Sequence, residues 1–297
     1  NDLAEWTIDT SILKETLKYS IPLIPHDLST RVAGLTSRIF INISGTLADV
    51  GLYSIAFQFG NLIDVIQVAV NKAFQPWFFD MMNKNDMNSR KEAVNLSNVL
   101  LVFYSLVYML IGLFSQEVVL LMTNNSYHLS WTVIPIVVIG FSVKSMYYFY
   151  VNIIMFYKQA ARRLFIATIT GSLSDIVLAY ILVKYLGMYG SAIAFVLAKI
   201  IIIFIVVYIS KLYDDAGYSV IKMLSIIIPS LLFMVMGLYF SYTKYLTVFS
   251  IKNLAYKILV LFMYILFIYF TNKKGINKIL KTEYIKKINI RRKIIKK

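Results

Sequence analysis

Runs of about 20 apolar residues recur along most of this chain, and each run is long enough to cross the hydrocarbon core of a bilayer as a helix. A backbone in lipid must satisfy its own hydrogen bonds, which leaves only helices or closed barrels. The runs are too long and too continuously apolar for barrel strands. The chain has 59% hydrophobic residues and a mean hydropathy of +0.70. This hydrophobic fraction is higher than that of a typical soluble domain. The sequence therefore predicts an all-α, polytopic membrane helical bundle.

About eight transmembrane helices are predicted, and an even number places both termini on one side of the membrane. Basic residues mark the cytoplasmic side. One set of loops holds ten Lys or Arg and the tail after residue 270 holds eleven, whereas the opposite loops hold only Lys184, Lys244 and Lys252. We therefore expect both termini to lie on the cytoplasmic side of the inner membrane. The predicted helices cover residues 14–43, 47–79, 93–114, 130–157, 163–184, 190–211, 221–242 and 252–270.

This topology divides the chain into a cytoplasmic N-terminal segment (1–13), a transmembrane helical domain (14–270) and a basic cytoplasmic tail (271–297). The chain opens on Asn1 rather than Met, as if in the middle of a longer protein. The net charge of +15 is explained by loops and tail, so no nucleic-acid partner is expected. The sequence contains no cysteine and shows no metal motif, no cofactor motif and no Ser–His arrangement. Membrane lipids are the expected surroundings, and an enzyme is not expected.

Two arginines, Arg31 and Arg38, lie inside the first hydrophobic segment and share one helical face with Asp27 and Asn42. A charge at the bilayer centre costs at least ~2.5–3.5 kcal/mol, so such residues face protein or water rather than lipid. The second helix carries a similar polar stripe that includes Asp64, Gln67 and Asn71. Two adjacent polar stripes predict a shared aqueous cleft that accepts something anionic.

Other charges lie deep in the later helices. Lys144 and Lys199 are near the middle of the fourth and sixth predicted helices, too deep for easy snorkelling to the interface, and Asp175 lies on the fifth. Lys72 is expected to snorkel, and for Lys257 snorkelling remains open. The predicted substrate-binding residues are Arg31, Arg38, Asn42, Gln67, Asn71, Lys144 and Lys199.

The acidic residues Asp27, Asp64 and Asp175 are expected to pair with these cations or to couple transport to protons. For Asp27 and Arg31, four residues apart, a purely structural ion pair is an equally open interpretation. For Asp64 and Asp175, simple pairing with the intramembrane cations is the alternative.

Several segments resemble the second half of polysaccharide flippases, the O-antigen and capsule repeat-unit transporters of the multidrug/oligosaccharidyl-lipid/polysaccharide exporter superfamily. The similarity runs from about residue 17 to residue 270. At two positions the chain departs from the family pattern, with Ser37 where Asp is frequent and Asp175 where Asn is common. The segments that carry the resemblance are YSIPLIPH at 19–26, SRIF at 37–40, VGLYSIA at 50–56, AFQPW at 73–77 and YLGMYGSAIA at 185–194.

The resemblance implies two helical lobes around a central cavity, of which this chain would form the second lobe plus two trailing helices. The N-terminal lobe would then be a missing partner. The implied function is flipping of an oligosaccharide linked to polyprenyl pyrophosphate, for lipopolysaccharide or capsule synthesis, with Arg38 and Arg31 binding the pyrophosphate. A cation-coupled multidrug exporter and a membrane glycan polymerase are the alternatives. Six intramembrane basic residues against three acidic ones argue against the exporter.

Overall fold

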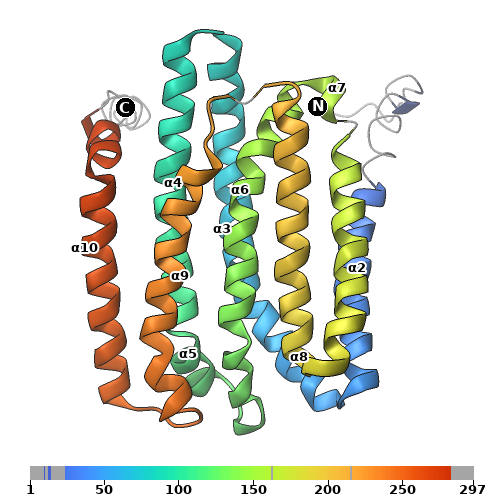
Figure 1. Ribbon diagram of the computed structural model, residues 1–297, viewed down its shortest axis with the longest axis vertical. Helices are drawn as coiled ribbons and strands as arrows, with labels where there is room; N and C mark the ends of the chain where they lie inside the picture. The colour runs from blue at the N-terminus through green and yellow to red at the C-terminus, as the bar shows by residue number, and fades with distance from the viewer. Residues whose placement is uncertain (1–9, 11–12, 15–23, 162, 215, 282–297) are drawn as a thin grey trace, which may run out of the picture.

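The computed structural model describes residues 10, 13–14, 24–161, 163–214 and 216–281, and within these it contains helices and no strands, which confirms the all-α prediction. The long helices run side by side in one bundle (Figure 1). Their bounds are α2 (Ile24–Ser44), α3 (Leu47–Asn83), α4 (Met87–Leu113), α6 (Ile134–Phe156), α8 (Leu164–Lys211), α9 (Val220–Thr243) and α10 (Ile251–Lys281). Shorter helices are α5 (Ser115–Met122), the 3-10 helix η2 (Asn125–Thr132) and α7 (Lys158–Ala161).

Six of the described helices, α3, α4, α6, α8, α9 and α10, are long and apolar enough to cross a membrane. The 48 residues of α8 form two arms rather than one rod, because Gly187 has φ 53° and ψ −133°, a conformation that L side chains rarely adopt. The arms lie side by side in Figure 1, so the predicted helices at 163–184 and 190–211 meet at this turn. With α2 beside α8, the bundle has the eight long segments expected.

Local capping sets where several helices begin. Thr46 and Asp49 form a reciprocal capping box at the start of α3. Asp86 accepts hydrogen bonds from the backbone N–H groups of Asn88 and Ser89, which starts α4 six residues earlier than the predicted boundary at residue 93. The fourth predicted helix begins four residues late, because η2 forms before Ile134.

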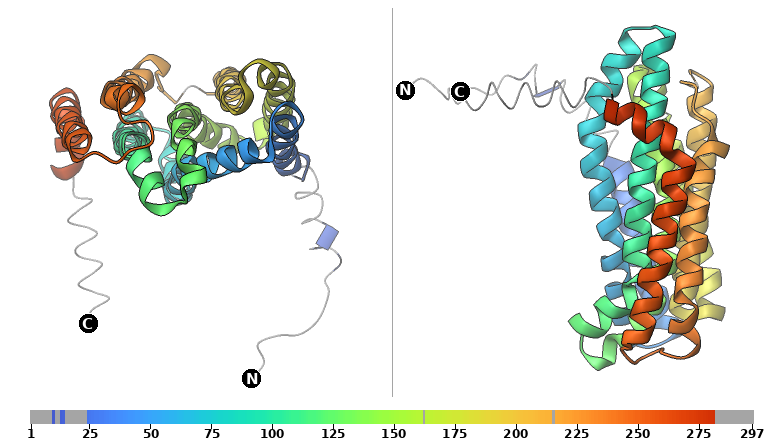
Figure 2. Two further views of the ribbon diagram at one scale, coloured as in Figure 1. Left: turned by 90° about the horizontal axis from the view of Figure 1, so that it is seen from below. Right: turned by 90° about the vertical axis from the view of Figure 1, so that its left-hand side faces the viewer.

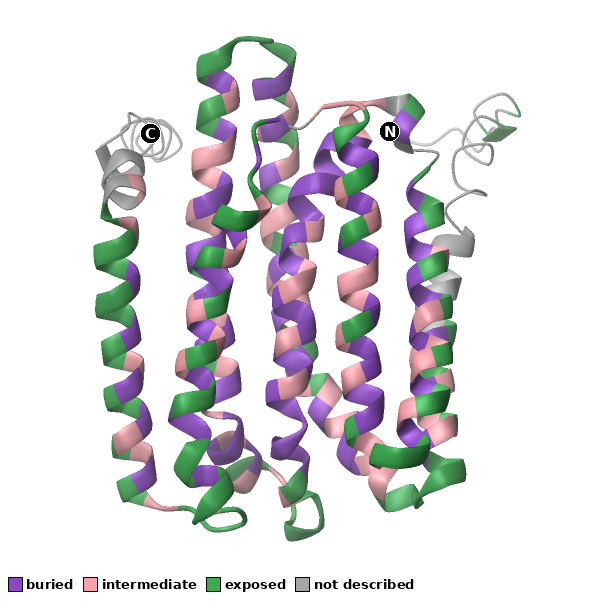
Figure 3. Ribbon diagram, in the orientation of Figure 1, coloured by how far each residue is buried: buried purple, intermediate pink, exposed green. Residues whose placement is uncertain are grey.

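Helix α6 lies at the centre of the bundle and packs against α3, α4, α8 and α9. Its residues are buried along nearly the whole length, whereas α10 is exposed on most of its surface (Figure 3). The view along the bundle in Figure 2 shows α2 and α8 at one side and α10 at the other. The described bundle thus has a packed centre, with α9 and α10 added at one edge.

A buried polar cluster attaches α10 to that edge. Lys257 has 0% of its side chain exposed and donates to Glu117 Oε2 at 2.8 Å and to Gln116 Oε1 at 3.1 Å. Asn253 donates to the same Gln116 oxygen, and Gln116 donates in turn to the backbone carbonyl of Tyr245. Lys257 therefore does not snorkel, and its partner is a glutamate of the short helix α5.

We expect Lys257→Met to lower the free energy of unfolding by roughly 3–5 kcal/mol, because it leaves the Glu117 charge buried and unpaired. The double variant Lys257→Met/Glu117→Leu should recover most of this loss. Denaturant unfolding in detergent micelles measures both. Lys252→Met, an exposed lysine of the same helix, is the control and should be nearly neutral. Equal stability of Lys257→Met and the control would contradict the structural role of the pair.

At the opposite end of the bundle, Asp214 joins three elements. Its carboxylate accepts from Arg90 NH1 of α4 at 2.9 Å, from the Tyr157 hydroxyl after α6 at 2.8 Å and from the backbone N–H of Ala216 at 2.8 Å. Burial acts to raise the pKa of Asp214, but these three hydrogen bonds and the Arg90 charge outweigh it, so the pKa falls below its ordinary value of 3.8.

A carboxyl whose pKa is lowered by folding stabilises the protein above its unfolded pKa, and this stabilisation is lost as pH falls through the folded value. We therefore expect Asp214→Asn to cost roughly 1–2 kcal/mol at pH 7. The difference between wild type and variant should shrink as the pH falls below about 4. Melting temperatures of both proteins, measured from about pH 2.5 to about pH 7, span the range in which this carboxyl titrates and therefore test the prediction. A difference in melting temperature that does not depend on pH would contradict the stabilising role of the Asp214 carboxylate.

Candidate anion-binding site in the helix bundle

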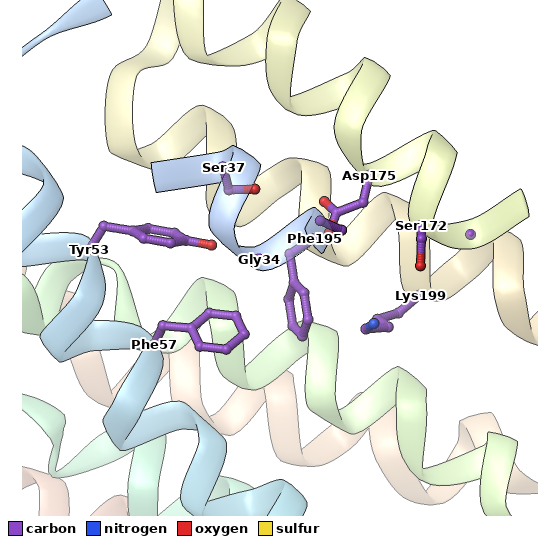
Figure 4. A pocket seen from close by; sticks show the side chains of 10 residues that line it. Gly34, Ser37, Tyr53, Phe57, Ser172, Asp175, Phe195 and Lys199 are labelled. Carbon is purple, nitrogen blue, oxygen red and sulfur yellow. The ribbon is translucent and has the colours of Figure 1, made fainter. Parts of the chain in front are cut away.

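A small cavity of about 60 Å³ lies where α2, α3 and the two arms of α8 meet (Figure 4). This volume holds a few water molecules, not a large ligand. Both polar and apolar side chains line it. The lining residues are Ala33, Gly34, Ser37, Tyr53, Phe57, Gly171, Ser172, Asp175, Phe195 and Lys199.

Asp175 and Lys199 supply the charges of this cavity, one from each arm of α8. Asp175 is 8% exposed, and its Oδ1 atom has no hydrogen-bond partner among the described residues. Lys199 interacts electrostatically with Asp175 but forms no direct ion pair with it in the part of the chain that is described. The Lys199 Nζ atom instead lies over the Phe195 ring, 4.8 Å from its centroid, a cation–π contact.

A second charged group, on α3 and α6, lies within electrostatic range of Lys199. Lys144 forms an ion pair with Asp64 at 2.8 Å, and the Tyr148 hydroxyl donates to Asp64 Oδ1 at 2.8 Å. The side chains of Lys144 and Asp64 keep 23% and 19% of their surface exposed, so this pair is not sealed. The predicted pairing of Asp64 with an intramembrane cation therefore occurs, and the cation is Lys144.

Arg38 of α2 differs from these groups because it has no carboxylate partner among the described residues. Its Nε donates to the Ser54 hydroxyl of α3 at 3.2 Å, and that is its one hydrogen bond within the described chain. Arg38 and Asp175 both interact electrostatically with Tyr53, which connects the arginine to the cavity. The arginine is half-buried.

The three predicted polar residues without charge, Gln67, Asn71 and Asn42, lie in different surroundings. Gln67 is fully buried and donates to the Tyr108 hydroxyl at 2.9 Å and to the carbonyl of Phe141 at 3.0 Å, so it joins α3 to α4 and α6. Asn71 accepts from Asn152 at 2.8 Å, again between α3 and α6. Asn42 is exposed near the end of α2, outside the cavity lining.

The first arginine of the stripe cannot be placed in the same way. The side chains of Arg31 and Asp27 lie outside the described residues, so their predicted pairing and substrate contact remain predictions. Lys72 is exposed on α3.

Three further residues contribute to the site and were not among the predicted site residues, namely Tyr53, Ser54 and Tyr148. Tyr148 follows Lys144 by four residues and therefore shares its helical face, which is a signal that could have identified it. Tyr53 and Ser54 are ordinary helix residues whose role depends on α3 passing close to α2. In the described part of the chain, no group of three His, Asp or Glu side chains could hold a metal ion.

The described charges of the site are three cations, Arg38, Lys144 and Lys199, and two carboxylates, Asp64 and Asp175. The site is therefore net positive. Of its cations, Arg38 and Lys199 have no ion pair among the described residues, and the planar fork of an arginine matches carboxylate and phosphate oxygens. This arrangement suits a phosphate-bearing anion.

No protein-family model and no curated protein matches this chain. Two solved structures are similar in fold. The lipid II flippase MurJ in an inward closed conformation aligns with 92% of this chain at 18% identity and a TM-score of 0.51. A MOP superfamily transporter from Pyrococcus furiosus aligns with 74% at 18% identity and a TM-score of 0.47.

The chain spans 57% of the MurJ chain and 53% of the Pyrococcus chain, so it corresponds to about half of each. At this identity the likeness to MurJ concerns the fold alone, which is a helical bundle.

The pair of Asp64 and Lys144 should behave as one unit. Asp64→Asn and Lys144→Gln should each destabilise the protein, and the double variant should lose less than the sum, with a coupling free energy of about 0.5–3 kcal/mol. Unfolding of all four proteins in micelles gives this value. Asp64→Asn combined with Lys72→Gln, which neutralises an exposed lysine, should be additive. A coupling near zero for the first pair would show that the ion pair contributes no interaction energy.

Proposed function

We propose that this chain forms one lobe of a membrane transporter that moves a lipid-linked, pyrophosphate-bearing oligosaccharide across the cytoplasmic membrane. Arg38 is the observation that carries the proposal, because a half-buried arginine without a carboxylate partner remains available to an incoming anion. The excess of three described cations over two carboxylates in the site supports the same class of substrate.

Moving such a headgroup through hydrocarbon requires stripping water from its charges and hydroxyls, at a cost far above thermal energy. A hydrated, basic site lowers this barrier by offering hydrogen-bond donors in place of water. In the proposed mechanism Arg38 binds the pyrophosphate, Lys199 adds positive charge nearby, and the lipid tail stays in the bilayer. Arg31 would extend the basic face. The sugar-facing roles proposed for Asn42 and Asn71 remain open, whereas the buried Gln67 holds the helices together.

The fold likeness to MurJ, described as a lipid II flippase, favours a lipid-linked substrate. We further propose that this chain corresponds to the second lobe plus two trailing helices of a repeat-unit flippase for O-antigen or capsule synthesis, and that an N-terminal lobe completes the cleft. Movement of one lobe against the other would then alternate access. The basic end of the bundle, with the α3–α4 turn and the α8–α9 loop, would face the cytoplasm.

A cation-coupled exporter of the same superfamily is the second candidate. One observation favours it: the Asp175 oxygen without a hydrogen-bond partner lies beside the cavity and would accept a cationic group. Efflux of cationic dyes from cells expressing the protein would favour this candidate, whereas glycan export would favour the flippase.

In the complete transporter, Arg38→Ala should reduce glycan export at least tenfold, because the loss of a charged hydrogen bond to phosphate costs roughly 1.5–3 kcal/mol. Arg38→Lys should retain part of the activity, since a lysine keeps the charge but not the bidentate fork. Export of the labelled glycan, normalised to the amount of protein in the membrane, is the measurement.

Lys72→Gln removes an exposed positive charge from the neighbouring helix and is the matched control, with export expected at the wild-type level. Normal export by Arg38→Ala at a normal protein level would overturn the assignment of this arginine. Formation of new glycosidic bonds by the purified protein would instead favour a polymerase.

A further inference from the structure

A groove of about 470 Å³ lies at the basic end of the bundle, apart from the cavity described above. It runs between the first turns of α4 and the loop that connects α8 to α9. Polar and apolar residues both line it. They are Met87, Arg90, Lys91, Val94, Asn95, Ala216 and Gly217.

The loop wall of the groove is held in a defined shape. Asp214 accepts from the backbone N–H of Ala216, and Ala216 has a φ of 49°, which an alanine rarely adopts. Arg90 holds the same carboxylate to α4 through a 2.9 Å ion pair. Gly217, with φ 81°, faces Val94 across the groove, where a Cβ atom would lie 3.7 Å from Val94 Cγ2. Such local strain is maintained only where surrounding contacts impose it.

The polar half of the groove consists of hydrogen-bond donors. Lys91 is exposed and has no ion-pair or hydrogen-bond partner among the described residues. Arg90 keeps 27% of its side chain exposed although it is paired with Asp214. Asn95 adds an amide from the next turn. Glu92, the acidic neighbour on α4, is not among the lining residues.

The N-terminus of α4 does not contribute its free N–H groups to the groove. Asp86 already accepts from the backbone N–H groups of Asn88 and Ser89, and from the Ser89 hydroxyl. Recognition of an anion in the groove therefore depends on the side chains of Arg90, Lys91 and Asn95.

The other half of the groove is apolar, formed by Met87, Val94 and Ala216. A small soluble anion has no apolar part that could contact this surface, whereas a phospholipid has both a phosphate and an acyl chain. The groove also lies at the start of α4 and just before α9, two helices that are long and apolar enough to cross a membrane. Lipid headgroups meet a membrane protein at the ends of its spans. Basic pockets between helices at this level bind anionic headgroups.

We propose that this groove binds an anionic phospholipid, with its phosphate against Lys91, Arg90 and Asn95 and the start of its acyl chain against Met87 and Val94. The proposal goes beyond the transported substrate, because these residues belong to a different region of the bundle from Arg38. Bound lipid and Asp214 would share Arg90, so lipid also reinforces the junction of α4 with the α8–α9 loop.

The test is lipid binding to the purified full chain in detergent, measured by native mass spectrometry with phosphatidylglycerol or phosphatidylcholine. Wild type should bind phosphatidylglycerol at least fivefold more tightly than phosphatidylcholine. Lys91→Gln should weaken phosphatidylglycerol binding about fivefold, the share of one cation near the phosphate. Asn95→Trp, which fills the groove without changing charge, should weaken it by a similar factor.

Lys222→Gln removes an exposed lysine at the same end, outside the groove, and should leave binding within about twofold of wild type. Melting temperatures establish that each variant folds. Equal losses in Lys91→Gln and Lys222→Gln would overturn the site in favour of general surface attraction, and so would wild-type binding by Asn95→Trp. Glycerol 3-phosphate, a soluble phosphate without acyl chains, is added as a competitor. If it displaces bound phosphatidylglycerol at a comparable concentration, the groove binds a free phosphate and the proposal of a phospholipid site is overturned.

Discussion

The cost of placing a charge in hydrocarbon governs how this bundle is built. An ionised side chain in a low-dielectric interior loses its hydration and must recover that free energy from a partner, from water or from a polarisable ring. The described intramembrane charges recover it in different ways. Lys257 is sealed against Glu117, Lys144 is paired with Asp64 in a partly open position, and Lys199 lies over a phenylalanine ring. Arg38 has only a serine hydroxyl.

This gradation distinguishes charges that are already fully paired inside the bundle from charges that could still contact a ligand. A fully buried pair with further hydrogen bonds, such as Lys257 and Glu117, has no capacity left for a ligand and acts as an anchor for α10. An accessible pair such as Asp64 and Lys144 can exchange partners, because an anion that approaches Lys144 competes with the carboxylate. Arg38 needs no exchange at all. Substrate contact is therefore expected to begin at the arginine, where no internal ion pair has to be broken.

The apolar runs predicted the fold because long apolar segments occur where the chain is surrounded by the hydrocarbon core of a bilayer. The thickness of that core then sets the length of each helix. They also placed the break between residues 184 and 190, where Gly187 turns the chain. Of the predicted site residues, Lys144 pairs with Asp64, and Lys199 lies within electrostatic range of that pair and of Asp175; the substrate-binding roles stay predictions. Periodicity failed for Gln67, which lies on the polar stripe of α3 yet turns inward. Its amide NH2 group donates to Tyr108 and to the carbonyl of Phe141, and one sequence does not reveal such partners on other helices. Glu117 was missed for the same reason, since its partner is 140 residues away.

The size of the cavity constrains how the proposed function could operate. About 60 Å³ accommodates a few waters, whereas a lipid-linked oligosaccharide needs a passage many times larger. The described cavity is therefore not itself such a passage. In the proposed transporter the passage would form along the face that carries Arg38, with a second surface opposite. In such an arrangement the cavity serves as the hydrated back wall of the passage. Asp175 and Lys199 would set its electrostatic potential from behind, while Arg38 makes the contact.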